Sequence, residues 1–238
     1  MRQKKFEIRK ELALDATPEQ VWDAIATGPG LTAWFAPMEI DPDSETVVAW
    51  EPGKRLAIQT PQAEDGSTQA FEYLIEARDE GSTVLRFVHS GFLGDDWSDE
   101  FESSTGMGWD MYLNTLAQYL THFAGRPAVY VEAESPSSGQ PGTWARLLAA
   151  FQAGTGGRPV ELGTDVHLDL PGLGAIDGEV DYLSSNFVGL RTADALIRVH
   201  GRAPIDTTVA VSHHAYGSDL DVRAATQAWE SWLADLVA

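Results

Sequence analysis

The sequence contains no cysteine. Disulfide bonds, thiolate metal ligands and a cysteine nucleophile are therefore excluded. It also lacks a run of about 18 apolar residues, so no membrane-spanning helix is expected. The N-terminal segment is basic, but no apolar stretch with a cleavage site follows it, and we predict no signal peptide. Together these absences favour a cytoplasmic location.

Basic residues are also scarce. The chain has 16 Lys and Arg against 36 Asp and Glu, which gives a formal net charge of -20. Five of the basic residues fall in the first ten positions, at Arg2, Lys4, Lys5, Arg9 and Lys10. Such an acidic surface repels nucleic acid and anionic lipid headgroups, so no nucleic-acid partner is expected. The acidity either only keeps the protein in solution or steers a cationic partner.

The N-terminal segment predicts a strand followed by a capped helix. Residues Lys5–Leu14 alternate loosely between apolar and polar side chains, as a strand does. Thr17 is then placed to be an N-cap, with Pro18 at the first helical position and Gln20 completing a capping box. We expect this helix to stop at 28–30, and a second short helical turn to cover 31–35.

The pattern then becomes that of an antiparallel sheet and one long helix. Strands are predicted at Met38–Ile40, Thr46–Trp50, Arg55–Thr60, Gln69–Arg78 and Thr83–Phe92, with turns at 51–54 and 79–82. From Asp99 to Phe123 the apolar period is helical, and Gly125 ends the segment. This order of elements is typical of an α+β fold.

Three segments of the first half resemble a known superfamily. They are Ala16–Trp22 with the Trp34-Phe35 pair, His89–Phe92 at the end of a strand, and Gly108-Trp109 followed by Leu113 and Leu116. Their order and spacing are similar to the START-like, or SRPBCC, superfamily, and most of all to the subgroup named after the activator of the Hsp90 ATPase. The resemblance covers residues 1–125. It implies a helix-grip fold, in which an antiparallel sheet curves around a long C-terminal helix with an apolar cavity between them.

The second half carries a weaker copy of the same organisation. Residues Thr143–Gly154 resemble the helix at 17–28, and Thr208–His214 can be laid over Thr83–His89 without a gap. Trp229, Leu233 and Leu236 repeat the spacing of Trp109, Leu113 and Leu116. We predict two tandem helix-grip domains, at 1–125 and 126–238, the second diverged. The alternative is an extension that packs on the first domain.

Large aromatic residues are the main candidates for a binding site. The predicted ligand-binding residues are Trp34, Phe35, Trp50, Phe71, Tyr73, Phe87, His89, Trp109, Tyr112 and Leu113. These side chains suit a pocket for an apolar or aromatic ligand, although for any single one of them plain core packing is the better explanation. The assignment of a pocket follows from the resemblance.

Other motifs favour structural interpretations. His213 and His214 are neighbours on a predicted strand, so they point to opposite faces and do not ligate one metal together. No metal site and no cofactor are predicted. The Gly-rich segment at 154–158 lacks the Lys-Ser/Thr of a phosphate-binding loop. An acidic cluster, made of Asp95, Asp96, Asp99, Glu100 and Glu102, suits the positive end of the long helix.

Three functions follow from the resemblance. The leading hypothesis is non-catalytic binding of a small hydrophobic molecule, of the lipid, sterol or aromatic polyketide type, with His89 or Tyr73 setting its orientation. One alternative is a cyclase or hydrolase that uses His89, as a cavity acid or base, with a nearby acid. The other is a module that interacts with a chaperone. The sequence leaves the ligand and the oligomeric state open.

Overall fold

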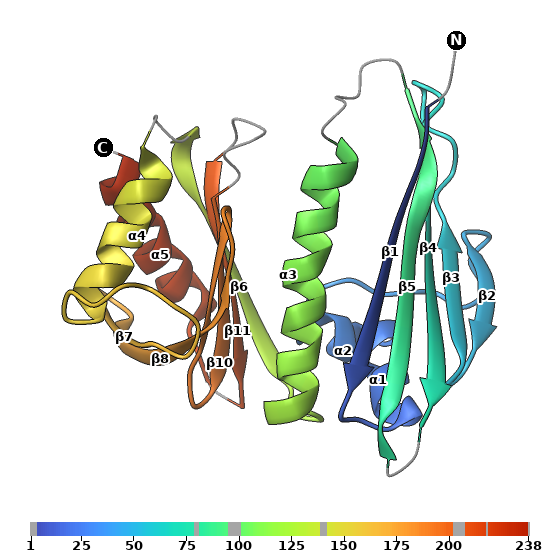
Figure 1. Cartoon of the computed structure of the whole chain (residues 1–238), viewed down its shortest axis with the longest axis horizontal. Helices are drawn as coiled ribbons and strands as arrows, with labels where there is room; N and C mark the ends of the chain where they lie inside the picture. The colour runs from blue at the N-terminus through green and yellow to red at the C-terminus, as the bar shows by residue number, and fades with distance from the viewer. Residues whose placement is uncertain are drawn as a thin grey trace. The chain divides into compact units, whose positions relative to one another are not determined.

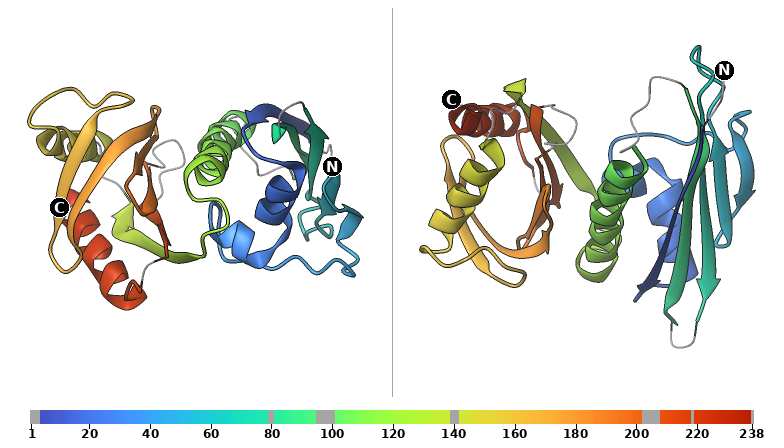
Figure 2. Two further views of the ribbon diagram at one scale, coloured as in Figure 1. Left: turned by 90° about the horizontal axis from the view of Figure 1, so that it is seen from below. Right: turned by 45° about the horizontal axis from the view of Figure 1, so that its top comes forward.

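The computed structural model describes residues 4–78, 81–94, 101–138, 142–201, 208–217 and 219–237. The chain divides into two compact units, Met1–Gly125 and Arg126–Ala238 (Figure 1). In each unit an antiparallel sheet curls around a C-terminal helix (Figure 2). The predicted α+β helix-grip architecture is therefore confirmed.

The first unit has five strands and three helices among its described residues. They are β1 (Lys4–Leu14), α1 (Pro18–Ala26), α2 (Gly28–Thr32), β2 (Val47–Glu51), β3 (Arg55–Gln59), β4 (Thr68–Ala77), β5 (Thr83–Leu93) and α3 (Phe101–His122). The strand order is β1-β5-β4-β3-β2 and every neighbouring pair is antiparallel. All three helices lie on one face of this sheet (Figure 1).

The first helix begins as the sequence predicts. The Thr17 hydroxyl accepts a hydrogen bond from the Gln20 amide, and the Gln20 side chain accepts one from the Thr17 amide at 2.9 Å. The end of this helix differs from the prediction, because α1 already ends at Ala26 and Gly28 begins α2. Thr27 has an extended backbone, and its hydroxyl accepts from the Gly30 amide, so this residue is the N-cap of a new helix.

One predicted strand is absent from the sheet. Residues 38–40 have no strand conformation, although their apolar alternation favours one. Pro37 and Pro42 flank this run, and each lacks the amide hydrogen that a ladder would need. The predicted turn at 51–54 does form, with Gly53 at φ 70°. The residues at 79–80 and the acidic cluster at 95–100 lie outside the described residues, and Glu102 is in the first turn of α3.

The second unit has the same kind of sheet. Its elements are β6 (Ala128–Ser138), α4 (Thr143–Gly154), β7 (Asp165–Leu170), β8 (Gly174–Leu183), β9 (Phe187–Arg191), β10 (Ala195–His200), β11 (Thr208–Tyr216) and α5 (Val222–Val237). The strand order is β6-β11-β10-β9-β8-β7. Its first five strands follow the order of the first sheet, and β7 is an edge strand with no counterpart among the described residues there.

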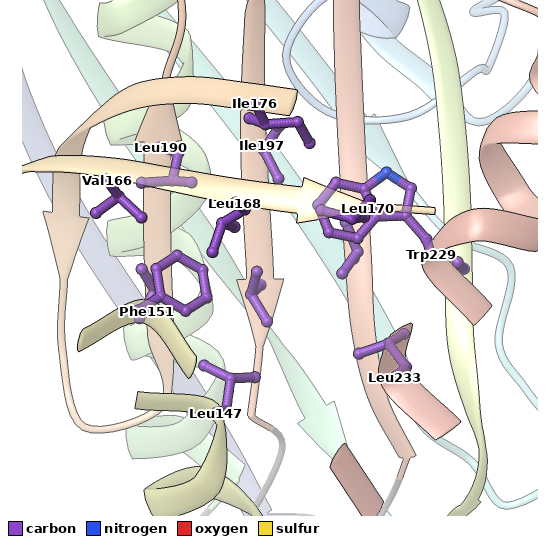
Figure 3. Close-up of a cluster of buried hydrophobic side chains, with 14 of the residues drawn as sticks. Leu147, Phe151, Val166, Leu168, Leu170, Ile176, Leu190, Ile197, Trp229 and Leu233 are labelled. Atoms are coloured by element: carbon purple, nitrogen blue, oxygen red, sulfur yellow. The ribbon is translucent and has the colours of Figure 1, made fainter. Parts of the chain in front are cut away.

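The core of the second unit lies between its sheet and its two long helices (Figure 3). Leu147 and Phe151 enter it from α4, and Trp229 and Leu233 enter it from α5, all four fully buried. They pack on the inward-facing side chains of the strands, such as Ile197. The spacing of the two residues on each helix, four positions apart, puts both on one face and so directs each helix against the sheet.

Candidate functional site

A cavity of about 370 Å³ lies in the first unit, among α1, α2, α3 and the inner face of the sheet. Six of the ten predicted ligand-binding residues line it, namely Phe35, Phe71, Tyr73, His89, Trp109 and Tyr112. They come from four different segments of the chain, so only the folded sheet and α3 bring them together. The Phe35 ring lies nearly parallel to Trp109, at 5.9 Å between ring centroids, and meets Tyr112 edge-on at 4.8 Å.

The other four predicted residues do not line the cavity. Trp34 is fully buried behind it, where its indole N–H donates to the Ala24 carbonyl at 2.9 Å. Trp50 packs edge-to-face on Trp22. The fully buried Phe87 lies against the Trp109 ring at 4.2 Å, and Leu113 is buried one helical turn beyond Trp109. These four side chains pack against other residues of the first unit and are not part of the cavity wall.

His89 is held from both sides of its ring. Its Nδ1 accepts a hydrogen bond from the Trp109 indole N–H at 3.0 Å, and its Nε2 lies 3.0 Å from Oε1 of Gln69. Because Nδ1 is the acceptor, the proton of the neutral ring is on Nε2 and is donated to Gln69. Burial lowers the pKa of His89 to about 4, so the ring is neutral at pH 7. His89 therefore fixes Trp109 and Gln69 at the cavity wall.

Tyr73 offers a polar group that the fold does not use. Its side chain is buried and lines the cavity. Among the described residues its hydroxyl has no hydrogen-bond partner. Burial raises the pKa of this phenol well above its usual value, so it stays a neutral donor and acceptor. A bound molecule with a hydroxyl or carbonyl group would satisfy it.

The sequence interpretation missed several lining residues. Gln69, Met38, Ile40, Thr105 and Gly108 also line the cavity. Gln69 had a usable signal, since it stands two residues before Phe71 on one strand and therefore on the same face. Met38 is 46% exposed and lies at the cavity's edge, which identifies the segment before β2 as part of its opening.

The second unit contains the same tryptophan–histidine pair. The Trp229 indole N–H donates to Nδ1 of His213 at 3.3 Å. The cross-strand neighbours of His213 are Val131 and Ile197, as Ile8 and Phe71 are those of His89. Burial also lowers the pKa of His213 to about 4.

This pair corrects one detail of the sequence comparison. The gapless superposition matches His89 with His214, whereas the structure matches it with His213. The apolar run before these histidines fits either register, but a shift of one residue moves a side chain to the other face of the sheet. His214 faces away from Trp229 and lies 5.0 Å from the Tyr130 ring. The two histidines thus point to opposite faces, as predicted, and among the described residues no cluster of three metal ligands is found.

A curved antiparallel sheet that holds a C-terminal helix, with an apolar cavity between the two, defines the START-like fold. Both units of this chain have that sheet and helix, and the first unit has the apolar cavity of about 370 Å³ between them. No protein-family model and no curated protein matches the chain. In the described part of the chain, no helix has both the length and the apolar character that crossing a bilayer requires.

Several solved structures are similar to this chain. DynU16, a protein in the dynemicin biosynthetic locus, is 15% identical over 97% of this chain and 95% of its own, with a TM-score of 0.40. Protein MLL2253 from Mesorhizobium loti is 20% identical over 50% of this chain and 98% of its own, with a TM-score of 0.42. The Aha1 dimer from Colwellia psychrerythraea is 19% identical over 48% and 96%, with a TM-score of 0.38. At these levels the likeness says nothing about what this chain binds.

Proposed function

We propose that the first unit binds a small hydrophobic molecule in its cavity and does so without catalysing a reaction. The observation that carries this proposal is the cavity of about 370 Å³, whose wall is mainly aromatic and aliphatic. That size is within the range of small-molecule sites, which are mostly apolar with a few placed polar groups.

The polar groups of the wall favour a ligand that carries hydroxyl or carbonyl groups. The Tyr73 hydroxyl on β4 is available to it, and Thr105 on α3 also lines the cavity. The rings of Phe35, Trp109 and Tyr112 offer aromatic faces and edges, so a polycyclic aromatic molecule of the polyketide type fits the wall better than a flexible chain. A ligand that buries about 200 Å² of apolar area would gain about 5 kcal/mol before the costs of binding.

The state of His89 favours binding over catalysis. Both of its ring nitrogens already have partners, and its lowered pKa leaves it a poor base at neutral pH. The described lining contains no carboxylate that would act with it. His89 is therefore a positioning residue, which keeps Trp109 and Gln69 in place.

A chaperone-binding role has less support. The large apolar side chains that are exposed among the described residues are Met38, Val48, Phe92, Leu162 and Val222. They lie on five separate segments of the chain. A docking surface for an unfolded or chaperone partner would instead need a contiguous apolar patch.

Filling the cavity from α3 provides the test. A Cβ placed on Gly108 meets no heavy atom within 4 Å, so a side chain can leave the helix at this position, and because Gly108 lines the cavity, Gly108→Leu extends into it. Gly106 on the same helix has equal room but does not line the cavity, so Gly106→Leu is the matched control. Both changes replace a helical glycine, which stabilises α3 by about 1 kcal/mol.

The probes are emodin, lauric acid and cholesterol, added to the full chain in a thermal-shift and calorimetry series. We expect at least one of them, emodin first, to raise the Tm of the wild type and of Gly106→Leu, and to leave that of Gly108→Leu unchanged. Equal binding by Gly108→Leu and the wild type, or no shift with any of the three, would refute the proposal.

A further inference from the structure

We propose that the second unit contains a second ligand site, at His213, for a small neutral molecule that carries a hydrogen-bond acceptor. A separate cavity of about 230 Å³ lies there, lined by residues of β8, β10 and β11, the turns before β8 and β10, and Leu220 ahead of α5. It shares no residue with the cavity of the first unit.

The donor of this site is Nε2 of His213. The side chain lines the cavity, and the residue is only 6% exposed. Trp229 donates to Nδ1, so the proton of the neutral ring is on Nε2. Among the described residues Nε2–H has no hydrogen-bond acceptor. This donor lines the cavity, where a ligand that supplies an acceptor can pair with it.

Comparison of the two units explains why this donor is unpaired. In the first unit Gln69 stands two residues before Phe71, the cross-strand neighbour of His89, and it accepts the Nε2 proton. In the second unit Ala195 stands two residues before Ile197, the cross-strand neighbour of His213. The acceptor is thus replaced by a methyl group, which leaves both an unpaired donor and the space beside it.

The wall determines the class of ligand. Small side chains at Ala175, Ala193, Ala195 and Ala215 give the cavity its room, and Ile176 and Leu220 make its wall apolar. Asp177 and Asp194 are exposed at its rim and repel an anion. The site therefore favours a neutral ketone, ester or amide over a carboxylate.

The experiment uses the full chain with ¹⁵N-labelled histidine. Acetophenone is the probe, and α-methylstyrene, which has the same shape with a methylene in place of the carbonyl oxygen, is its control. We expect acetophenone to shift the ring nitrogen signals of His213 in a saturable way and to bind about fivefold more tightly than α-methylstyrene. Equal affinities for the two probes, or shifts confined to His89, would overturn the proposal.

Two variants and one control variant assign the effect to this cavity. Ala195→Gln installs the counterpart of Gln69 and should abolish acetophenone binding, whereas Ala149→Gln, on the exposed face of α4, should not. Trp229→Phe frees Nδ1 and should reduce the preference for acetophenone, with little effect on α-methylstyrene. If the NMR signal of the Trp229 indole N–H is lost in Ala195→Gln, that variant is misfolded. The preference of Trp229→Phe for acetophenone over α-methylstyrene then decides whether His213 binds the probe.

The second site does not depend on the first. In Gly108→Leu, which closes the first cavity, the response of His213 to acetophenone should persist. Its loss there would mean that the signal reports the first cavity, and the second site would be rejected while the proposed function of the first unit stands.

Discussion

The two buried histidines make stability depend on pH with a definite sign. His89 and His213 both have a pKa of about 4 in the folded protein, because burial disfavours the charged ring. In the unfolded chain a histidine titrates near 6.5. As the pH falls from about 6.5 to about 4, the unfolded chain therefore binds protons that the folded chain refuses. The stabilising effect of each neutral ring is complete above this window and is lost within it.

His89→Gln tests this linkage. The free energy of unfolding of the wild type should fall by up to about 3 kcal/mol more than that of His89→Gln between pH 7 and pH 4. Urea denaturation at constant ionic strength measures both.

His167→Gln is a contrasting control, because Asp177 and Asp169 raise the pKa of the exposed His167. The stabilising effect of His167 is present at low pH and is lost as the pH rises. Between pH 7 and pH 4 the free energy of unfolding of the wild type should therefore fall less than that of His167→Gln. If the free energies of unfolding of His89→Gln and of the wild type fell in parallel between pH 7 and pH 4, the lowered pKa of His89 would be contradicted.

The stability of the second unit should depend strongly on a buried ion pair. The guanidinium of Arg198 donates two hydrogen bonds to the Asp181 carboxylate, at 2.9 and 2.8 Å, and the two side chains are 1% and 2% exposed. Asp181→Asn leaves a buried positive charge without its counter-charge. We expect it to lower the free energy of unfolding by about 3 kcal/mol or more.

The matched control for this pair lies on the same strand. Glu179 pairs with Arg191 at 3.0 Å, but the two side chains are 43% and 25% exposed, so water screens the attraction. Glu179→Gln should cost less than about 1 kcal/mol. Chemical denaturation of both variants gives the comparison. Similar losses from the two changes would show that burial does not distinguish these pairs.

At the scale of elements, the start of α1 depends on one hydroxyl. Thr17→Ala removes the side chain that accepts from the Gln20 amide, so an N-terminal amide of the helix loses its partner. We expect a loss of about 1 kcal/mol in the free energy of unfolding. Thr121→Ala is the control, since that hydroxyl only bonds back to the Ala117 carbonyl within α3. It should change stability by less than about 0.5 kcal/mol or raise it, because alanine favours a helix.

Local signals in the sequence account for the elements that were predicted well. The capping box at Thr17 and the alternation of Leu85, Phe87 and His89 depend on neighbours two to four residues away, which a sequence shows directly. Residues 38–40 show the limit of such signals. Their alternation favours a strand, yet the prolines on both sides prevent pairing, and the segment instead forms part of the cavity wall.

The candidate site was predictable only in part, because it depends on cross-strand register. Six of its aromatic and histidine residues were found from their type and face, but Trp34, Trp50, Phe87 and Leu113, which are also large and apolar, do not line the cavity. The role of Gln69 as partner of His89, and the absence of that partner at Ala195, follow only from which residues face each other across strands. One sequence gives no register between segments that are far apart.

At the scale of the whole molecule, the two units are variations on one plan. The strand orders agree over five strands, and each unit fastens its C-terminal helix to the sheet by a tryptophan–histidine hydrogen bond. The differences concern the surroundings of that bond. The first unit has Gln69 and a cavity of about 370 Å³ beside His89, and the second has Ala195, the added strand β7 and a cavity of about 230 Å³ beside His213. This comparison supports the proposal that the chain is a tandem of two helix-grip domains.

If the units are independent domains, each should fold when the chain is cut between them. Each encloses its own core, and Gly125, at φ 75°, ends the first after α3. We expect residues 1–125 and residues 126–238, expressed separately, to unfold cooperatively on heating, with near-ultraviolet circular dichroism spectra that sum to that of the full chain. The first fragment should bind emodin as the full chain does. The second should show the same NMR signal for the Trp229 indole N–H as the full chain, because its hydrogen bond to His213 is kept. If either fragment instead has native far-ultraviolet but no near-ultraviolet signal, its core is incomplete alone, and the chain is one domain with an extension.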